Sequence, residues 1–195
     1  MRRGLSFAIG TALLALMILP GSVLFAVQSS PKSSLTSNTA NWYYSQQATD
    51  ILNHIQTLAA RARQELEPLQ VQEVDLSWQV QADMLDRAKH DVNMMGNDLL
   101  QLEKMKGQLE PWQENLISRI TPMVHEMVYQ LDEAIAQINQ YQDPVRLSLT
   151  EYPQNVALFC KNAGDITGTV GTFNQYVHAE QEMAALQRKI APARS

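Results

Sequence analysis

The stretch from Ile117 to Tyr141 constrains the fold of this chain most strongly, because its apolar residues recur at alternating steps of three and four. The residues with this spacing are Ile117, Ile120, Val124, Met127, Leu131, Ala134, Ile138 and Tyr141. Such spacing places all of these side chains in one narrow stripe along an α-helix, as in helical bundles and coiled coils. The stripe must be covered by other elements, so the sequence predicts further helices of the same kind.

Three other stretches carry the same pattern. The first begins after Asn38 or Thr39 and ends before Pro68, with a stripe of Tyr44, Ala48, Ile51, Ile55, Leu58, Ala62 and Leu66. The second begins near Asp75 or Ser77, and its stripe is Trp78, Leu85, Ala88, Val92, Met95, Leu99, Leu102 and Leu109. The last ends near Ile190, and its stripe is Val156, Phe159, Ala163, Ile166, Val170, Phe173, Val177 and Ala184.

The connections between these stretches predict their relative directions. Glu110-Pro111 is a short turn, because proline suits the first position of a new helix. Residues 140–153 form the longest irregular connection, with room for a short helical piece. Short turns favour antiparallel neighbours, so we predict an all-α fold, a long antiparallel up-down four-helix bundle over residues 42–191. Residues 192–195, which begin with Pro192, form a tail.

The N-terminus predicts export. Arg2 and Arg3 precede an apolar run over residues 5–27, the charge pattern of an export signal. The run is also long enough to span a bilayer. Residues 1–28 are therefore either a cleaved signal peptide, favoured by Pro20-Gly21, or an uncleaved anchor that holds the chain in the membrane. Both interpretations place the rest of the chain outside the cytoplasm, in the periplasm or secreted. Residues 29–41 are serine-rich and predict a flexible tether.

The charge balance argues against nucleic-acid binding. The first acidic residue is Asp50, so removal of residues 1–27 leaves 13 basic against 20 acidic residues, a net charge of −7. Duplex DNA and RNA require a concentrated positive surface instead. The only cysteine, Cys160, cannot close an internal disulfide and is expected to be a small, buried apolar side chain.

No cofactor or metal is expected from the histidines, which fall one in each predicted helix as His54, His90, His125 and His178. Only His54 flanks a stripe, whereas bundle metal sites need inward ligands. No histidine follows a glutamate by three residues, and one cysteine excludes a Cys-x-x-Cys-His haem motif. Acidic residues four positions away predict the helical pairs Asp50/His54, Asp86/His90 and His178/Glu182.

The most unusual patch of the sequence is a run of small residues in the last helix, comprising Gly164, Thr167, Gly168 and Gly171. Glycine and threonine are poor helix formers. Gly164-x-x-x-Gly168 lets another backbone approach closely. The patch predicts tight packing inside the fold, a locally unwound hinge, or a contact face for a partner or ligand.

These features predict an exported or membrane-anchored, non-enzymatic helical bundle that acts through protein contacts, with an unidentified partner or by self-association. The alternative is an extracytoplasmic bundle that senses or binds a small molecule or metal. An enzyme is not expected, because no nucleophile stands with an oriented base.

Overall fold

The computed structural model describes residues 35–70 and 76–190, with side chains from Ser45 to Lys189. These residues form helices and no strand, so the predicted all-helical class is confirmed for this part of the chain. The elements are α1 (Leu35–Leu66), the 3-10 helix η1 (Glu67–Gln70), α2 (Trp78–Lys104), α3 (Pro111–Tyr141), α4 (Pro144–Leu147) and α5 (Tyr152–Ile190). The predicted export segment 1–28, the tail 192–195 and the side chain of Tyr44 lie outside the described part.

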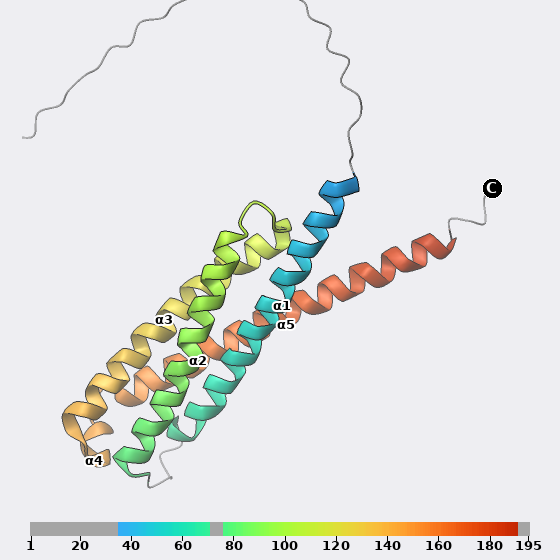
Figure 1. Cartoon of the computed structure of the whole chain (residues 1–195). Helices are drawn as coiled ribbons and strands as arrows, with labels where there is room; N and C mark the ends of the chain where they lie inside the picture. The colour runs from blue at the N-terminus through green and yellow to red at the C-terminus, as the bar shows by residue number, and fades with distance from the viewer. Residues whose placement is uncertain (1–34, 71–75, 191–195) are drawn as a thin grey trace, which may run out of the picture. The chain divides into compact units, whose positions relative to one another are not determined.

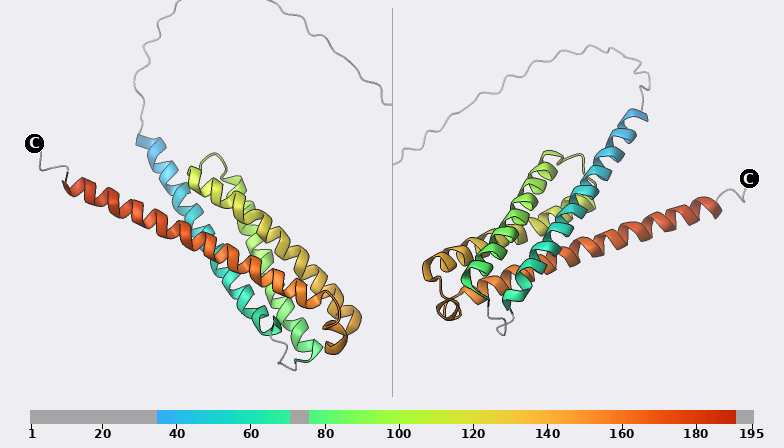
Figure 2. Two further views of the ribbon diagram at one scale, coloured as in Figure 1. Left: turned by 180° about the vertical axis from the view of Figure 1, so that it is seen from behind. Right: turned by 60° about the horizontal axis from the view of Figure 1, so that its bottom comes forward.

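Each of the four long helices packs against two others. Helix α1 contacts α2 and α5, and α3 contacts the same two helices. Successive long helices run in opposite directions (Figure 1). The C-terminal end of α1 and the start of α2 lie at one end, together with the end of α3 and the start of α5 (Figure 1). The turn between α2 and α3 lies at the other end, which we call the turn end; α1 starts and α5 finishes beyond it (Figures 1 and 2).

The predicted stripes meet in one core. Its largest fully buried side chains are Leu52, Ile55, Leu58, Leu66, Leu85, Met95, Leu102, Leu116, Ile120, Met127, Ile138 and Phe159. Burying one side chain of this size contributes about 1.5–3 kcal/mol relative to leaving it exposed. Pro122 lies on the exposed side of α3, and the helix continues through it.

Two predicted helix ends need correction. Helix α2 ends at Lys104, before the predicted end near Leu109, because the chain turns at Gly107, whose φ of 85° suits glycine. Helix α1 begins at Leu35 and therefore extends into the segment 29–41 predicted as a tether. The short helical piece expected in the long connection is present as α4.

The predicted stripe of α5 is buried for only part of its length. Its last buried residue is Val170, whereas Phe173, Val177 and Ala184 are half-buried. This corrects the prediction that the stripe packs in the core as far as Ala184. The reason is that α5 continues past the turn end, where α2 and α3 no longer accompany it (Figure 2).

None of the described helices combines the length and the apolar character that a bilayer crossing requires.

Candidate functional site

A buried glutamine fixes the start of α3 against α1. Gln113 is fully buried, and its Nε2 donates to the Ser45 carbonyl oxygen (2.7 Å) and to Thr49 Oγ1 (3.1 Å). Its Oε1 accepts from the backbone N–H of Glu110 (3.0 Å), the residue that caps α3. These bonds use both N–H donors and the oxygen of the side-chain amide, so they hold the first turn of α3 in one position.

The neighbouring Trp112 thereby lies between α1 and α5. Its ring stacks on Phe173 of α5, with ring centroids 6.4 Å apart and an interplanar angle of 19°. An offset aromatic stack of this kind contributes about 0.5–1.5 kcal/mol beyond area burial. The position of the Trp112 ring at the turn end is therefore fixed. Helix α5 continues beyond it.

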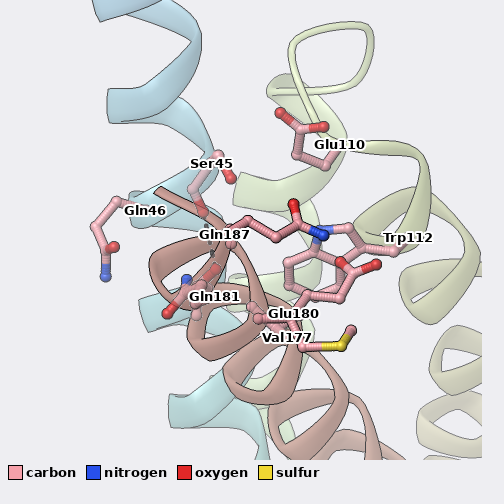
Figure 3. A pocket seen from close by; sticks show the side chains of 11 residues that line it. Ser45, Gln46, Glu110, Trp112, Val177, Glu180, Gln181 and Gln187 are labelled. Atoms are coloured by element: carbon pink, nitrogen blue, oxygen red, sulfur yellow. Dashed lines mark hydrogen bonds between the residues drawn. The ribbon is translucent and has the colours of Figure 1, made fainter. Parts of the chain in front are cut away.

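A groove of about 590 Å³ opens beside Trp112, between the N-terminal half of α1 and the C-terminal half of α5 (Figure 3). The residues that line it are Ser45, Gln46, Thr49, Glu110, Trp112, Val177, Glu180, Gln181, Met183, Ala184 and Gln187. We call it the turn-end groove. It is the candidate functional site, because it is a concave surface that combines apolar and polar side chains.

The groove is lined by apolar side chains, uncharged polar side chains and two carboxylates. Trp112, Val177 and Met183 supply apolar surface, whereas Glu110 and Glu180 are its only charged lining residues among those described. The Tyr176 hydroxyl donates to Glu180 Oε1 (2.7 Å), and this bond raises the pKa of Tyr176. These lining side chains complement a bound molecule that presents an apolar group beside a positive charge. The described lining contains no histidine, cysteine or lysine that could act as a base or nucleophile.

Two of the polar pairs that join α1 to α2 use a buried aspartate of α2. Asp91 is buried and accepts a hydrogen bond from Arg61 Nε (2.7 Å), and a second bond joins the Arg61 Nη2 to the other carboxylate oxygen. This carboxylate raises the pKa of Arg61. Seven residues further along α2, buried Asp98 lies 2.7 Å from the Nδ1 of His54. Because both helices use a seven-residue step, the two pairs fix one antiparallel register.

The structure corrects one of the predicted histidine pairs. His54 flanks the α1–α2 interface as predicted, but its partner is Asp98 across that interface, whereas Asp50 accepts from Gln46 Nε2 (3.2 Å). The helical pair His178/Glu182 is confirmed, with 3.5 Å between Nδ1 and Oε1.

No ion pair joins the remaining predicted partners, Asp86 and His90, in the described part of the chain.

The small residues of α5 do not share one environment. A Cβ on Gly164 would lie 3.0 Å from Arg63 Nη1, and one on Gly171 would lie 3.1 Å from Gln56 Nε2, so α1 packs closely on both. Gln56 also donates to the Thr167 carbonyl oxygen (3.0 Å). Gly168 is exposed, with no atom within 4 Å of a Cβ built there. Helix α5 is unbroken here, so the structure does not show a locally unwound hinge.

Cys160 is buried, as the sequence predicted. Burial raises the pKa of its thiol to about 11, so the thiol is protonated and unreactive near neutral pH. Within residues 35–70 and 76–190, no three side chains of histidine, cysteine, aspartate or glutamate gather where they could hold a metal ion.

Comparison of the chain with protein-family models found no match, and comparisons with curated proteins and with solved structures found no significant similarity.

Sequence reasoning missed the turn-end groove and the two α1–α2 pairs. The signal for the pairs was present, since Asp91 and Asp98 each precede a stripe residue and stand seven apart, as do His54 and Arg61. The signal for the groove was weaker. It consisted of Trp112 at a predicted turn and of polar Gln181 interrupting the stripe of α5.

Proposed function

We propose that this chain is an exported or membrane-anchored, non-enzymatic protein that acts through protein–protein contacts in the cell envelope. In this proposal residues 1–28 are a signal peptide or anchor, and residues 42–191 form a long antiparallel up-down four-helix bundle. Two observations support the bundle: successive long helices run in opposite directions, and each of α1, α2, α3 and α5 packs against two of the others. The positive N-terminus and the apolar run of residues 5–27 support export.

The observation that carries the proposed function is the turn-end groove. Its apolar wall at Trp112 and its carboxylates at Glu110 and Glu180 favour a partner segment that presents an apolar side chain next to lysine or arginine. Aromatic side chains in such positions often dominate binding energy. The groove is thus the proposed contact site for a segment of another envelope protein.

The test uses residues 29–195. Every buried core residue of the described part lies between Ala48 and Val170, and the described helices belong to one compact unit, so this fragment keeps the described core. Ala184→Arg places a long cation in the groove, whereas the control Ala185→Arg alters an adjacent exposed position outside it. With partners captured from an envelope extract, we expect Ala184→Arg to weaken binding about tenfold or more. Equal binding by both variants, or no capture by the unmodified fragment, would overturn the proposal.

Of the small residues predicted as a contact face, Gly164, Thr167 and Gly171 lie against α1, which leaves Gly168 on the exposed side of α5. We therefore propose only Gly168 as part of an external contact.

The alternative function is binding of a small ligand outside the cytoplasm. The groove volume of about 590 Å³ lies in the range of small-molecule pockets, which favours this second candidate. A library of small cationic and amphipathic molecules would then raise the melting temperature of residues 29–195, and Ala184→Arg would abolish that increase. A melting temperature unchanged by every compound would leave protein contacts as the better interpretation.

A further inference from the structure

Helix α5 carries a second apolar stripe on its outward side. Tyr176, Ala179, Met183 and Leu186 follow one another at steps of three and four, and the sequence continues this spacing to Ile190. Tyr176, Met183 and Leu186 are 56%, 59% and 57% exposed. At 100° per residue this stripe lies on the side of the helix opposite the buried stripe that ends at Val170. We call it the outer stripe.

The outer stripe differs from an isolated exposed apolar residue such as Leu100. Leu100 on α2 is as exposed (60%), but its neighbours on the helix surface are Gly96, Asn97, Glu103 and Lys104. Single apolar residues of that kind are normal on protein surfaces. A row at alternating three- and four-residue steps is instead the pattern of a helix that packs against another helix.

The described part of this chain offers no helix to cover the outer stripe. Helix α5 packs on α1 and α3 through its opposite side, and its last turns extend past the turn end (Figures 1 and 2). A partner helix could therefore lie along the stripe without meeting α2 or α3. Because α5 is already a continuous helix of 39 residues, association would order little additional chain.

The charges beside the stripe favour a second copy of the same chain in antiparallel orientation. In a two-fold pair that places Met183 opposite the second copy's Leu186, Glu182 lies beside the second copy's Lys189, and symmetry repeats this pair. Both residues are exposed. A parallel pair would place Glu182 beside the second copy's Gln187 and would gain no opposite charge.

We infer that the outer stripe of α5 is the interface of an antiparallel dimer, in which Met183 and Leu186 of two copies interlock and Glu182 faces Lys189. The inference rests on the proposed function, because it names one of the protein contacts through which the chain acts. A stripe of about two heptads is roughly 20 Å long, which is short for a coiled-coil interface, so we expect a weak dimer that forms as the protein concentration is raised.

Sedimentation velocity of residues 29–195 over a wide concentration range tests the dimer. The unmodified fragment should shift from monomer to dimer as concentration rises. Leu186→Glu should weaken association tenfold or more, whereas the matched control Leu100→Glu should leave it unchanged. A monomer at every concentration, or a dimer that both substitutions leave intact, would overturn the inference. Capture of a different protein through Met183 and Leu186 by a fragment that stays monomeric would also overturn it.

Charge exchange tests the orientation. Glu182→Lys and Lys189→Glu each place like charges together in the antiparallel dimer, so each should weaken association about three- to tenfold. The double variant restores opposite charges and should recover the original affinity. His178→Ala serves as a control, because it removes the His178–Glu182 pair within one chain and should have no effect on association. If the double variant instead loses as much affinity as the two single variants together, the antiparallel register is wrong.

Disulfide trapping gives a second test of orientation. Chains with Met183→Cys mixed with chains with Leu186→Cys should form mixed disulfides faster than either chain forms with itself, while buried Cys160 remains inert. Faster linking between identical positions would indicate a parallel pair and overturn the inference. Met183 belongs to both surfaces, whereas Ala184 lines only the turn-end groove and Leu186 lies only in the outer stripe. Ala184→Arg should therefore leave sedimentation unchanged and Leu186→Glu should leave capture of the groove's partner unchanged, so failure of the dimer and failure of the groove can be told apart.

Discussion

The two halves of α5 form one continuous helix but are stabilised in different ways. Residues 152–170 include the buried side chains of Tyr152, Asn155, Val156, Phe159, Cys160, Ala163, Ile166 and Val170. This half also contains Gly164, Thr167 and Gly168, which are poor helix formers. Residues 177–189 have no buried side chain, yet from Ala179 to Lys189 every residue is a strong helix former.

The difference shows that a helix can continue beyond the packed core of the fold. The first half is helical because its apolar stripe is buried against α1 and α3, which overrides weak local propensity. The second half is helical because of its own residues, and it adds little to the core. Its apolar residues are therefore available for contacts outside the chain, at the turn-end groove and along the outer stripe.

The largest expected effect compares one apolar residue from each half. Phe159→Ala removes a fully buried ring and should lower the free energy of unfolding by about 3–5 kcal/mol, whereas Leu186→Ala should change it by less than about 0.5 kcal/mol. Urea unfolding of dilute residues 29–195 measures both values. Comparable losses would show that the C-terminal half belongs to the core after all.

A second prediction uses the thiol of the buried half. The Cys160 thiol has a pKa of about 11 in the folded chain, against 9.0 for an unperturbed thiol. As pH rises above 9, the thiol of the unfolded chain loses its proton, whereas the thiol of the folded chain keeps its proton up to about pH 11. Deprotonation therefore stabilises the unfolded chain. The thiol has no effect on the free energy of unfolding below pH 9 and lowers it above pH 9.

Between pH 9 and 11 the unmodified fragment should therefore lose roughly 2–3 kcal/mol more stability than Cys160→Ala does. Unfolding midpoints of the two chains across this range measure the difference. Parallel pH profiles would contradict deep burial of the thiol.

The smallest effect concerns two glycines near the end of the first half, Gly168 and Gly171. Gly168→Ala should stabilise the protein by up to about 1 kcal/mol, because a Cβ there meets nothing and alanine favours helix. Gly171→Ala should gain less or destabilise, because its Cβ displaces Gln56 from its hydrogen bond to Thr167.

Gly96→Ala on α2 is the matched control for Gly168→Ala, since a Cβ there also meets nothing. Thermal unfolding ranks the three variants. A larger increase in melting temperature for Gly171→Ala than for Gly168→Ala would contradict the finding that Gly168 is exposed and Gly171 packs against α1.

Much of the fold followed from the sequence, because apolar spacing reports directly which side of a helix is buried. Most residues of the stripes predicted for α1, α2 and α3 are buried in the core, whereas Ile51, Trp78, Leu109, Ile117 and Tyr141 are half-buried beside it. Pro111 is the first residue of α3, as predicted. The end of α2 was misplaced because Leu109 continued the apolar pattern, whereas the positive φ of Gly107 ended the helix. Local backbone geometry decided that boundary.

The candidate site was harder to predict, because it depends on how distant segments are aligned. The pairing of His54 with Asp98 requires the register between two helices, which intrahelical spacing does not give. The groove requires Trp112 to be placed against Phe173. The outer stripe has the same spacing in the sequence as the stripe through Val177 and Ala184. Because the two stripes overlap in one helix, the prediction included only the stripe that continues the buried side.

Hydrogen exchange of residues 29–195, measured by mass spectrometry at low and at high protein concentration, tests the central claim most directly. At low concentration residues 177–190 should exchange much faster than residues 152–170, whose amides open only with the core. At high concentration residues 177–190 should become protected, while residues 152–170 stay unchanged. Equal protection of both segments at low concentration, with no change on concentrating the protein, would contradict the account.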